Sequence, residues 1–326
     1  FARAHTHRTG ILCAGGAFHG MTCGALSLMG GTMWREDFEP LLPGVESIPY
    51  LDLAALETKL ATGKFAAFIV EPVQSESGMH SPPAADWLKA AEICRRHKTL
   101  LVLDEVQTGI GRTGKFLAAH HSGVEADMII LAKALSGGLM PVSAVLMREE
   151  INRSVFTNIE RSMLHASTFA ENTLSMRAGL TVLDILEEEN LCERSRVMGE
   201  ILRNGIRDLA RRYELIGEVR GAGLMNGIEF RQPTSRRLKL LQAGFAKMHP
   251  GLFGQMLIRA LQVDEGILTQ MCGHNFRVVK ASPPLVATDG EISQFIEGLG
   301  RTMEKVHSGM RFWVSGLKIA ARALRA

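Results

Sequence analysis

The chain has 326 residues, of which 46% are hydrophobic and 22% are charged, and its net charge at neutral pH is +3. A chain of this length can bury a large core in one domain or two. Its small net charge excludes the broad basic field that nucleic-acid binding usually needs. No apolar run approaches the roughly 18 residues that span a bilayer, so neither a nucleic-acid nor a membrane partner is expected.

The five cysteines are scattered along the chain, with no CxxC pair and no His/Cys spacing typical of a zinc site. We therefore predict no metal centre. Two or three of the cysteines are expected to fill apolar positions as small hydrophobic residues. A reducing, cytoplasmic setting is the corresponding expectation.

Short apolar runs alternate with helical patterns in the first half of the chain. The runs are bounded by turn residues and are too short for typical helices; they cover residues 65–70, 100–103, 128–132 and 142–147. Residues 84–97 carry apolar side chains at helical spacing. Continuous apolar runs separated by helices predict strands buried on both faces of a largely parallel sheet, and therefore an α/β fold.

The second half has a different, α+β pattern. Leucines at helical spacing between 180 and 191 predict a long helix that runs past the glutamates at 187–189, and a second helix is expected at about 194–212. Residues 217–230 are predicted to form two short strands around a glycine-rich turn, and an apolar stripe predicts a helix over 292–306. We therefore predict a large domain over 1–177 and a smaller α+β domain over 178–326.

Two further segments have more than one interpretation. Residues 232–254 are polar and then mixed, and they form either an insertion or a helix. Residues 310–326 place apolar side chains, among them Trp313, Leu317 and Leu324, between arginines and lysines. A basic amphipathic helix of this kind can lie on a membrane, but it more often packs on its own domain or on a partner, which is the expectation here.

Ionisable residues follow three consecutive predicted strands: Glu71, Asp104 and Lys133. In parallel α/β sheets, ligands bind at the carboxyl ends of the strands. Each residue taken alone has an ordinary explanation, because an acid after a strand is often a helix cap and a lone lysine is usually solvated. A carboxylate and a lysine at neighbouring strand ends, both after wholly apolar runs, instead indicate a binding site.

The Asp104 and Lys133 pair suits the chemistry of pyridoxal phosphate (PLP). A lysine at the end of a buried strand is expected to be partly desolvated, which would lower its pKa and free the amine to attack an aldehyde. PLP supplies such an aldehyde, and a carboxylate is the usual partner of its ring nitrogen. Asp104 would keep that nitrogen protonated, so that the ring can accept electrons from the substrate.

Three motifs identify a family. Residues 70–74 read Val-Glu-Pro-Val-Gln, residues 103–114 read Leu-Asp-Glu-Val-Gln-Thr-Gly-Ile-Gly-Arg-Thr-Gly, and residues 132–138 read Ala-Lys-Ala-Leu-Ser-Gly-Gly. In this order and at these intervals they closely resemble the class III aminotransferases, the relatives of ornithine, acetylornithine and putrescine aminotransferases. The resemblance covers nearly the whole chain. It implies a fold-type I PLP enzyme that works as a homodimer with shared active sites.

The resemblance also implies roles for individual residues. Lys133 would form the Schiff base with PLP and later move the proton, while Asp104 would pair with the ring nitrogen. Val106 and Phe18 would cover the two ring faces, and Gln107 would reach the phenolic oxygen. Thr168 would cross the dimer interface to the partner's phosphate, for which hydroxyl and amide groups are suited. The complete set assigned to the cofactor is Phe18, His19, Glu71, Asp104, Val106, Gln107, Lys133, Ser167 and Thr168.

The chain departs from the family at the position that grips a substrate carboxylate. Amino-acid-specific relatives carry an arginine three residues before a Pro-Pro pair, and this chain has Lys280 there. Lysine lacks the bidentate fork of arginine, so we expect weaker recognition of an α-carboxylate. Glu76, which matches a glutamate that covers the arginine in relatives, could pair with Lys280. In the other interpretation Lys280 is solvent-exposed and another basic residue, such as Arg277, binds the carboxylate.

Two further departures concern the phosphate side. Residues 169–173 read Phe-Ala-Glu-Asn-Thr where relatives have Phe-Gly-Gly-Asn-Pro, which introduces Glu171. Glu171 either helps to bind a cationic amine or caps the following helix. Relatives also carry, before the point that matches Phe1, a glycine- and serine-rich turn whose backbone amides bind the phosphate. The resemblance therefore implies an amino-terminally truncated chain that lacks half of the phosphate site.

The function predicted from these features is transfer of an amino group between an amine or amino-acid donor and an aldehyde or ketone acceptor, by a ping-pong mechanism and in specialised biosynthesis. The substrate residues assigned are Glu76, Glu171 and Lys280. Two alternatives stay open at this point. One is an aminomutase, racemase or decarboxylase that uses the same cofactor, and the other is a dimerisation module without catalytic activity.

Overall fold

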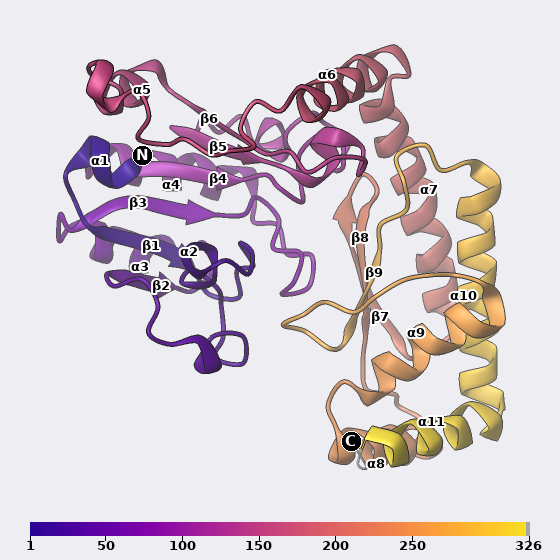
Figure 1. Ribbon diagram of the computed structural model, residues 1–326. Coiled ribbons are helices and arrows are strands. Elements are labelled where there is room, and N and C mark those ends of the chain that lie inside the picture. Colours follow the sequence, from indigo (N-terminus) through magenta and orange to yellow (C-terminus); the bar gives the residue numbers. More distant parts are fainter. Residues whose placement is uncertain (324–326) are drawn as a thin grey trace. The chain divides into compact units, whose positions relative to one another are not determined.

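The computed structural model describes residues 1–323, with side chains described except at 315 and 318–323. Leu324 and Arg325, which belong to the predicted carboxyl-terminal helix, lie outside the described residues. The described chain forms two compact units (Figure 1). Unit 1 comprises Phe1–Ser75 and Ser81–Cys192, and unit 2 comprises Glu76–His80 and the chain from Glu193 onward.

Unit 1 is a sheet with helices on both faces. Its strands, in the sheet order β2-β1-β3-β4-β5-β6, are β1 (Gly10–Ala14), β2 (Val45–Ile48), β3 (Phe65–Val70), β4 (Leu100–Asp104), β5 (Met128–Leu131) and β6 (Ala144–Met147). Its helices are α1 (Ala2–Thr6), α2 (Cys23–Leu26), α3 (Leu53–Leu60), α4 (Ala84–Arg96), α5 (Glu149–Val155) and α6 (Thr173–Glu188), with short 3-10 turns η1 (Glu36–Phe38), η2 (Ala118–His121), η3 (Lys133–Ser136) and η4 (Ile159–Arg161).

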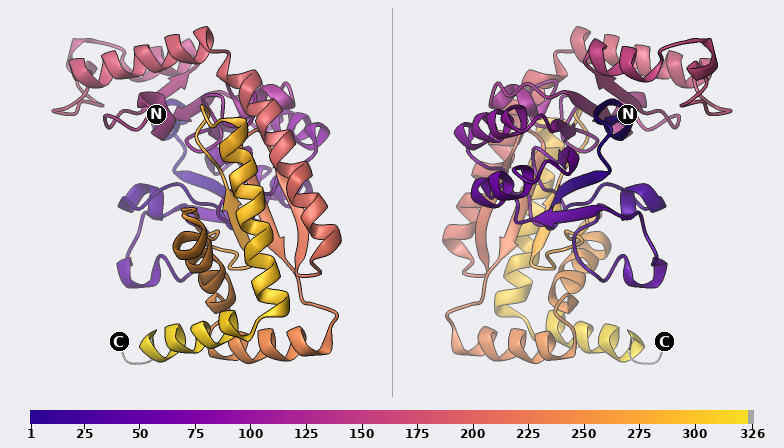
Figure 2. Two further views of the ribbon diagram at one scale, coloured as in Figure 1. Left: turned by 90° about the vertical axis from the view of Figure 1, so that its right-hand side faces the viewer. Right: turned by 90° about the vertical axis from the view of Figure 1, so that its left-hand side faces the viewer.

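The sheet is parallel except at one edge, where β6 pairs antiparallel with β5. Helices α3 and α4 lie on one face and α1 and α2 on the other (Figure 2). The α/β class and the four predicted strands are confirmed. β1 and β2 were not predicted, although β1 is buried along its whole length. β2 is a half-exposed edge strand, and its Val-Glu-Ser-Ile sequence gives only a weak apolar signal.

Unit 2 is a three-stranded antiparallel sheet packed against helices. The strands are β7 (Ile216–Ala222), β8 (Met225–Phe230) and β9 (Val278–Ala281), and the helices are α7 (Leu191–Arg212), α8 (Arg236–Met248), α9 (Leu252–Glu265), α10 (Asp289–Ser308) and α11 (Met310–Ala323). The predicted hairpin is therefore confirmed as β7 and β8. Its core joins α7, α10 and the sheet through buried residues such as Leu202, Ile228 and Met303.

One predicted helix is wrong at its carboxyl end. The helix over 180–191 does not run past the glutamates, because α6 ends at Glu188 and Asn190 adopts a left-handed conformation with φ of 49°. Leu191 then begins α7. The compact units also divide at Cys192/Glu193, whereas the domain boundary predicted from sequence lies at 177/178. Helix α6 packs on η3 in unit 1, and the Ser175 hydroxyl donates to the Pro141 carbonyl at 3.0 Å. The assignment of domains to these units stays a prediction.

Two helical glycines of unit 2 give a matched test of this packing. A Cβ at Gly199 in α7 would lie 1.8 Å from the backbone oxygen of Gly223, whereas a Cβ at Gly244 in α8 meets nothing within 4 Å. We expect Gly199→Ala to lower the free energy of unfolding by about 1–3 kcal/mol, because backbone must move to admit the methyl group. Gly244→Ala should raise it by about 0.5–1 kcal/mol through helix propensity. Urea unfolding of both variants measures this, and equal effects would contradict the close α7–β7/β8 contact.

Candidate functional site

A cavity of about 120 Å³ lies in unit 1 where β3, β4 and β5 end. It is lined by Phe18, His19, Gly20, Glu71, Val73, Asp104, Val106, Gln107, Thr108 and Lys133. Seven of the nine residues assigned to the cofactor from sequence are therefore brought together. The other two, Ser167 and Thr168, do not line the cavity.

Asp104 ends β4 and is almost fully buried. One of its oxygens, Oδ1, accepts a hydrogen bond from the Val106 backbone N–H at 3.0 Å. The other, Oδ2, lies 2.7 Å from Nδ1 of His19, whose side chain is also buried. An ionised carboxylate has about four acceptor positions, so Asp104 can still accept a hydrogen bond from a protonated ring nitrogen.

The contact with Asp104 determines the orientation of His19. Because a carboxylate only accepts, Nδ1 of His19 carries the proton and donates it to Asp104. The opposite ring nitrogen, Nε2, is buried and has no hydrogen-bond partner within the described part of the chain. Buried polar atoms are normally paired, so this orphaned nitrogen indicates that a polar group belongs beside it.

Phe18 and Glu71 hold each other in place. The backbone N–H of Phe18 donates to Oε2 of Glu71 at 3.2 Å. Trp34 packs edge-on against the Phe18 ring, with centroids 6.2 Å apart. Tyr50 donates its hydroxyl to the Glu71 carbonyl at 2.8 Å, and burial, with the nearby Glu71 charge, raises the pKa of Tyr50 well above its usual value. Sequence reasoning missed Trp34 and Tyr50, since lone aromatic residues give no positional signal.

Glu105 supports the loop that follows Asp104. It is fully buried and accepts hydrogen bonds from the Thr108 hydroxyl and from the backbone N–H groups of Ala118 and Ala119. Burial raises the pKa of the Glu105 carboxyl above its ordinary value, and these donors offset part of that shift. The carboxylate therefore ties η2 to the end of β4 and fixes the backbone on which Val106 and Gln107 are carried.

Lys133 begins η3 directly after β5, and its backbone is left-handed with φ of 47°. Such a conformation is costly for a residue other than glycine, and it is often retained at functional sites. The sequence predicted that this lysine is partly desolvated. For the single chain this prediction is wrong, because Lys133 is exposed. The turn carries it beyond the end of the buried strand, where it lines the cavity instead of the core.

The segment that contains Ser167, Thr168 and Glu171 is exposed. The Ser167 carbonyl accepts from the Ala170 N–H in a tight turn, and Glu171 is left-handed with φ of 54°. Glu171 does not cap α6. Asn172 does so instead, because its side chain accepts from the Leu174 and Ser175 N–H groups at 3.2 Å. The capping interpretation of Glu171 is therefore wrong, and its role in substrate binding stays a prediction.

Glu76 and Lys280 form a buried ion pair in unit 2. The side chain of Lys280, on β9, is 9% exposed, and its Nζ contacts Oε1 of Glu76. The Gly273 N–H donates to Oε2 of the same carboxylate at 2.7 Å. Lys280 is therefore not solvent-exposed, as one interpretation held, whereas Arg277 is.

Arg220, on β7, attaches the segment 76–80 to unit 2. Its Nε donates to the Gly78 carbonyl at 2.6 Å, and its charge is balanced by Glu229 at 2.6 Å and Glu218 at 2.7 Å. The His274 N–H also donates to the Glu76 carbonyl at 2.8 Å. Arg220 thus positions the backbone that carries Glu76. Sequence reasoning missed it because these partners are far apart along the chain.

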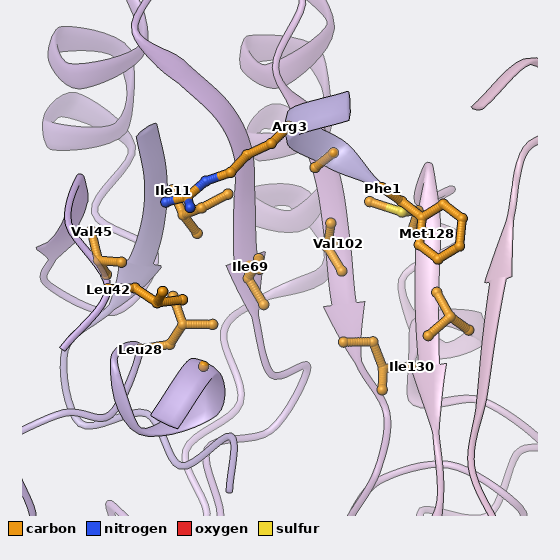
Figure 3. A pocket seen from close by; sticks show the side chains of 13 residues that line it. Phe1, Arg3, Ile11, Leu28, Leu42, Val45, Ile69, Val102, Met128 and Ile130 are labelled. Atoms are coloured by element: carbon orange, nitrogen blue, oxygen red, sulfur yellow. The ribbon is translucent and has the colours of Figure 1, made fainter. Parts of the chain in front are cut away.

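A second cavity in unit 1, of about 320 Å³, has a different character. Ile11, Ile69, Val102 and Ile130 project into it from four neighbouring strands, and Leu28 and Leu42 form one side (Figure 3). The guanidinium of Arg3 at its edge donates to the Pro43 carbonyl. Parallel sheets are normally buried on both faces, so this aliphatic surface is suited to packing against a further helix and not to a polar ligand.

The cavity at the strand ends fits the aromatic half of PLP. It offers a buried carboxylate for a ring nitrogen, a lysine amine for an aldehyde, the apolar side chains of Phe18 and Val106 for the ring, and an amide from Gln107. Among the described residues, no group of three His, Cys, Asp or Glu is arranged to hold a metal ion. No described helix has both the length and the apolar character needed to cross a membrane.

Comparison with known proteins agrees with this chemistry. The sequence profile of the family described as aminotransferase class-III matches residues 1–303. Among curated proteins, aminotransferase PigE of Serratia is 31% identical over 94% of this chain and 39% of its own length. Ornithine aminotransferase of Bacillus cereus is 37% identical over 89% of this chain and 65% of its own length. The chain thus spans less than two thirds of the length of these two relatives.

Solved structures give the same result for the fold. Ornithine aminotransferase of Toxoplasma gondii superposes with a TM-score of 0.82 at 30% identity, over 94% of this chain and 69% of that one. An amine transaminase from an uncultivated Pseudomonas species, solved in its PLP-bound form, gives a TM-score of 0.81 at 28% identity, over 94% and 73%. The predicted fold-type I architecture is therefore confirmed.

Proposed function

Because the chain belongs to the class III aminotransferases, a family of PLP-dependent enzymes, we propose that the protein is a transaminase. It would move an amino group from an amine or amino-acid donor to an aldehyde or ketone in two half-reactions, with ping-pong kinetics. One observation carries the proposal. Asp104 and Lys133, from the ends of two neighbouring strands, line one cavity together with Phe18, Val106 and Gln107.

The residues of the cavity have complementary tasks. PLP, when bound, supplies a carbonyl that takes up the amino group and a ring that withdraws electrons from the substrate carbon. Asp104 would hold a proton on the ring nitrogen, and the Nδ1–H of His19 would keep that carboxylate oriented. Phe18 and Val106 would restrain the ring between them. The Nζ of Lys133 would anchor the cofactor and then carry the proton between the reacting atoms.

The protein would work as a homodimer with shared active sites. The segment that carries Ser167 and Thr168 supports this part of the proposal, because it exposes large apolar side chains. Ile159 is 91% exposed and Phe169 is 80% exposed, and Met163, Leu164 and Leu174 are also exposed. Large apolar side chains exposed along one segment are typical of protein interfaces. A second copy packed here would bury it and bring Thr168 to the partner's phosphate.

Substrates without an α-carboxylate fit the charges of unit 2 best. Lys280 already has a carboxylate partner in Glu76, and the charge of Arg220 is balanced by Glu218 and Glu229. A lysine also lacks the fork that grips a carboxylate with two hydrogen bonds. We therefore infer that amines and neutral aldehydes are better substrates than α-amino acids. Specialised biosynthesis is the setting we propose.

The compartment we propose is the cytoplasm. All five cysteines are free thiols, and three of them, Cys13, Cys94 and Cys272, are buried. Burial raises the pKa of Cys13 to about 11 and that of Cys94 and Cys272 to about 12, so these thiols are unreactive as nucleophiles. A chain with buried free thiols and no disulfide suits a reducing environment.

Replacement of Lys133 tests the proposed reaction directly. With a donor and an acceptor present, Lys133→Ala should lower turnover by about 10²–10⁴-fold, the usual contribution of a positioned acid–base group. Lys89→Ala, which removes an exposed lysine from α4, should leave turnover unchanged. Full activity of Lys133→Ala would refute the proposal. Product formation without any acceptor would instead indicate a mutase, racemase or decarboxylase.

Restoration of the guanidinium fork tests the substrate preference. Lys280→Arg should raise kcat/KM for glutamate relative to butylamine about tenfold, since charge-assisted hydrogen bonds contribute about 1.5–3 kcal/mol. Arg277→Ala serves as the control, because this exposed arginine should not affect the ratio. If Arg277→Ala changed this ratio more than Lys280→Arg does, we would conclude that Arg277, and not Lys280, binds the substrate carboxylate.

An acidic substitution in the exposed apolar segment tests the dimer. Phe169→Asp should weaken self-association about tenfold or more, because buried aromatic residues dominate interface energetics. It should also weaken PLP binding, measured by cofactor titration. Leu88→Asp, which alters another exposed apolar residue of unit 1, should change neither property. Light scattering coupled to size-exclusion chromatography reports the mass, and an unchanged dimer in Phe169→Asp would contradict the proposed interface.

A further inference from the structure

The cations of the chain are unevenly distributed. Residues 231–263 contain six Lys or Arg and no Asp or Glu, and residues 306–326 contain four and none. The rest of the chain is therefore acidic on balance, although the total net charge is only +3. These two segments form α8, most of α9 and α11, and α11 lies beyond residue 303, where the family match ends.

Helices α8 and α11 lie at the same end of unit 2 in all three views (Figures 1 and 2). An aromatic cluster joins them. The ring of Phe245 on α8 lies 5.5 Å from Trp313 on α11, and Trp313 stacks on Phe253 at 5.9 Å. Trp313 also donates its indole N–H to the Val306 carbonyl. The expectation that the carboxyl-terminal helix packs on its own domain is thus confirmed for one of its faces.

The opposite face of each helix is exposed and combines cations with apolar side chains. On α8, Arg236, Leu240, Ala243 and Lys247 follow one another at helical spacing, opposite the buried Leu238 and Phe245. On α11, Met310, Val314 and Leu317 are exposed and also follow one another at helical spacing, and Arg311 lies beside them. Leu240 is 67% exposed and Leu317 is 54% exposed. We call these eight exposed residues the α8–α11 surface.

No carboxylate of the described chain balances these cations. Arg236, Lys247 and Arg311 form no ion pair among the described residues, whereas cations elsewhere on the chain, such as Lys59, Arg148 and Arg153, are paired with acids. Several acids in neighbouring segments are already engaged. Glu214 accepts from Thr234 and Ser235, and Asp264 and Glu265 pair with Lys305 and Arg301 on α10.

We propose that the α8–α11 surface binds peripherally to an anionic lipid bilayer. Leu240, Val314 and Leu317 would enter the headgroup region, while the surrounding arginines and lysines contact lipid phosphates and carboxylates. Basic helices with exposed apolar residues bind membranes through these two contributions together. A bilayer also needs no shape complementarity, which suits cations spread over two helices better than a single acidic protein segment does. This interaction is independent of the proposed transamination.

Vesicle binding by the intact, PLP-loaded protein tests the proposal. The protein should co-sediment with phosphatidylcholine vesicles that contain phosphatidylserine, but not with phosphatidylcholine alone, and added salt should weaken the binding. The double variant Arg236→Glu/Lys247→Glu should bind about 25-fold or more weakly, since each cation near an anionic bilayer contributes about fivefold. Leu240→Gln should weaken the part of the binding that persists in high salt.

The matched control changes two exposed lysines of unit 1. Lys64→Glu/Lys89→Glu alters the net charge equally and should bind vesicles as the unmodified protein does. Thermal unfolding and transaminase turnover of each variant verify that it is folded. Equal binding to both vesicle types, or equal loss in the two double variants, would overturn the proposal. Retention on soluble polyglutamate without vesicle binding would also overturn it, and would point to an acidic protein.

Discussion

The site of unit 1 depends on the parallel register of three strands. Val70 pairs with Leu103, and Asp104 pairs with Ile130, so the residues that follow these positions emerge at one edge of the sheet. Glu71, Asp104 and Lys133 are brought together for this reason alone, although more than 60 positions separate the first from the last along the sequence. A slip of one residue in β5 would turn its side chains to the other face of the sheet.

Of two consecutive buried carboxylates, one has a structural role and the other keeps acceptor positions for a ligand. Asp104 and Glu105 follow each other, and side chains of successive residues point to opposite sides of a strand. The carboxylate of Glu105 accepts hydrogen bonds from Thr108, Ala118 and Ala119, and it thereby ties η2 to the sheet. Within the described part of the chain, Asp104 receives hydrogen bonds from Val106 and His19, and it retains acceptor capacity toward the cavity. A buried carboxylate with unused acceptor positions is costly unless a ligand supplies the missing donor. This is why Asp104, and not its neighbour, fits a protonated ring nitrogen.

Much of this arrangement was predictable from sequence, for identifiable reasons. Apolar runs that end in ionisable residues predicted β3, β4, β5 and the strand-end residues Glu71, Asp104 and Lys133, because burial imposes a continuous apolar pattern. The other four cavity residues, Phe18, His19, Val106 and Gln107, were implied only by the resemblance to the class III aminotransferases. What sequence could not supply were contacts between distant segments. Arg220 attaches the backbone of Glu76 to β7 across more than 140 positions, and no local pattern records this. The exposure of Lys133 was also mispredicted, since the apolar strand before it says nothing about the left-handed turn in which it lies.

The distribution of charge in unit 2 follows from the cost of desolvation. A cation that is removed from water needs a partner, and the buried Lys280 and the largely buried Arg220 each have a carboxylate within contact. Such pairs are rigid, and they leave little unbalanced charge for a substrate carboxylate. Exposed cations have no such need, since water solvates them. Arg236, Lys247 and Arg311 can therefore stay without an ion-pair partner at little cost, and neither α8 nor α11 contains an acid. The aromatic cluster around Trp313 holds these two acid-free helices together. The proposed anionic surface would account for the absence of acids, because a single carboxylate among these cations would cancel part of the attraction.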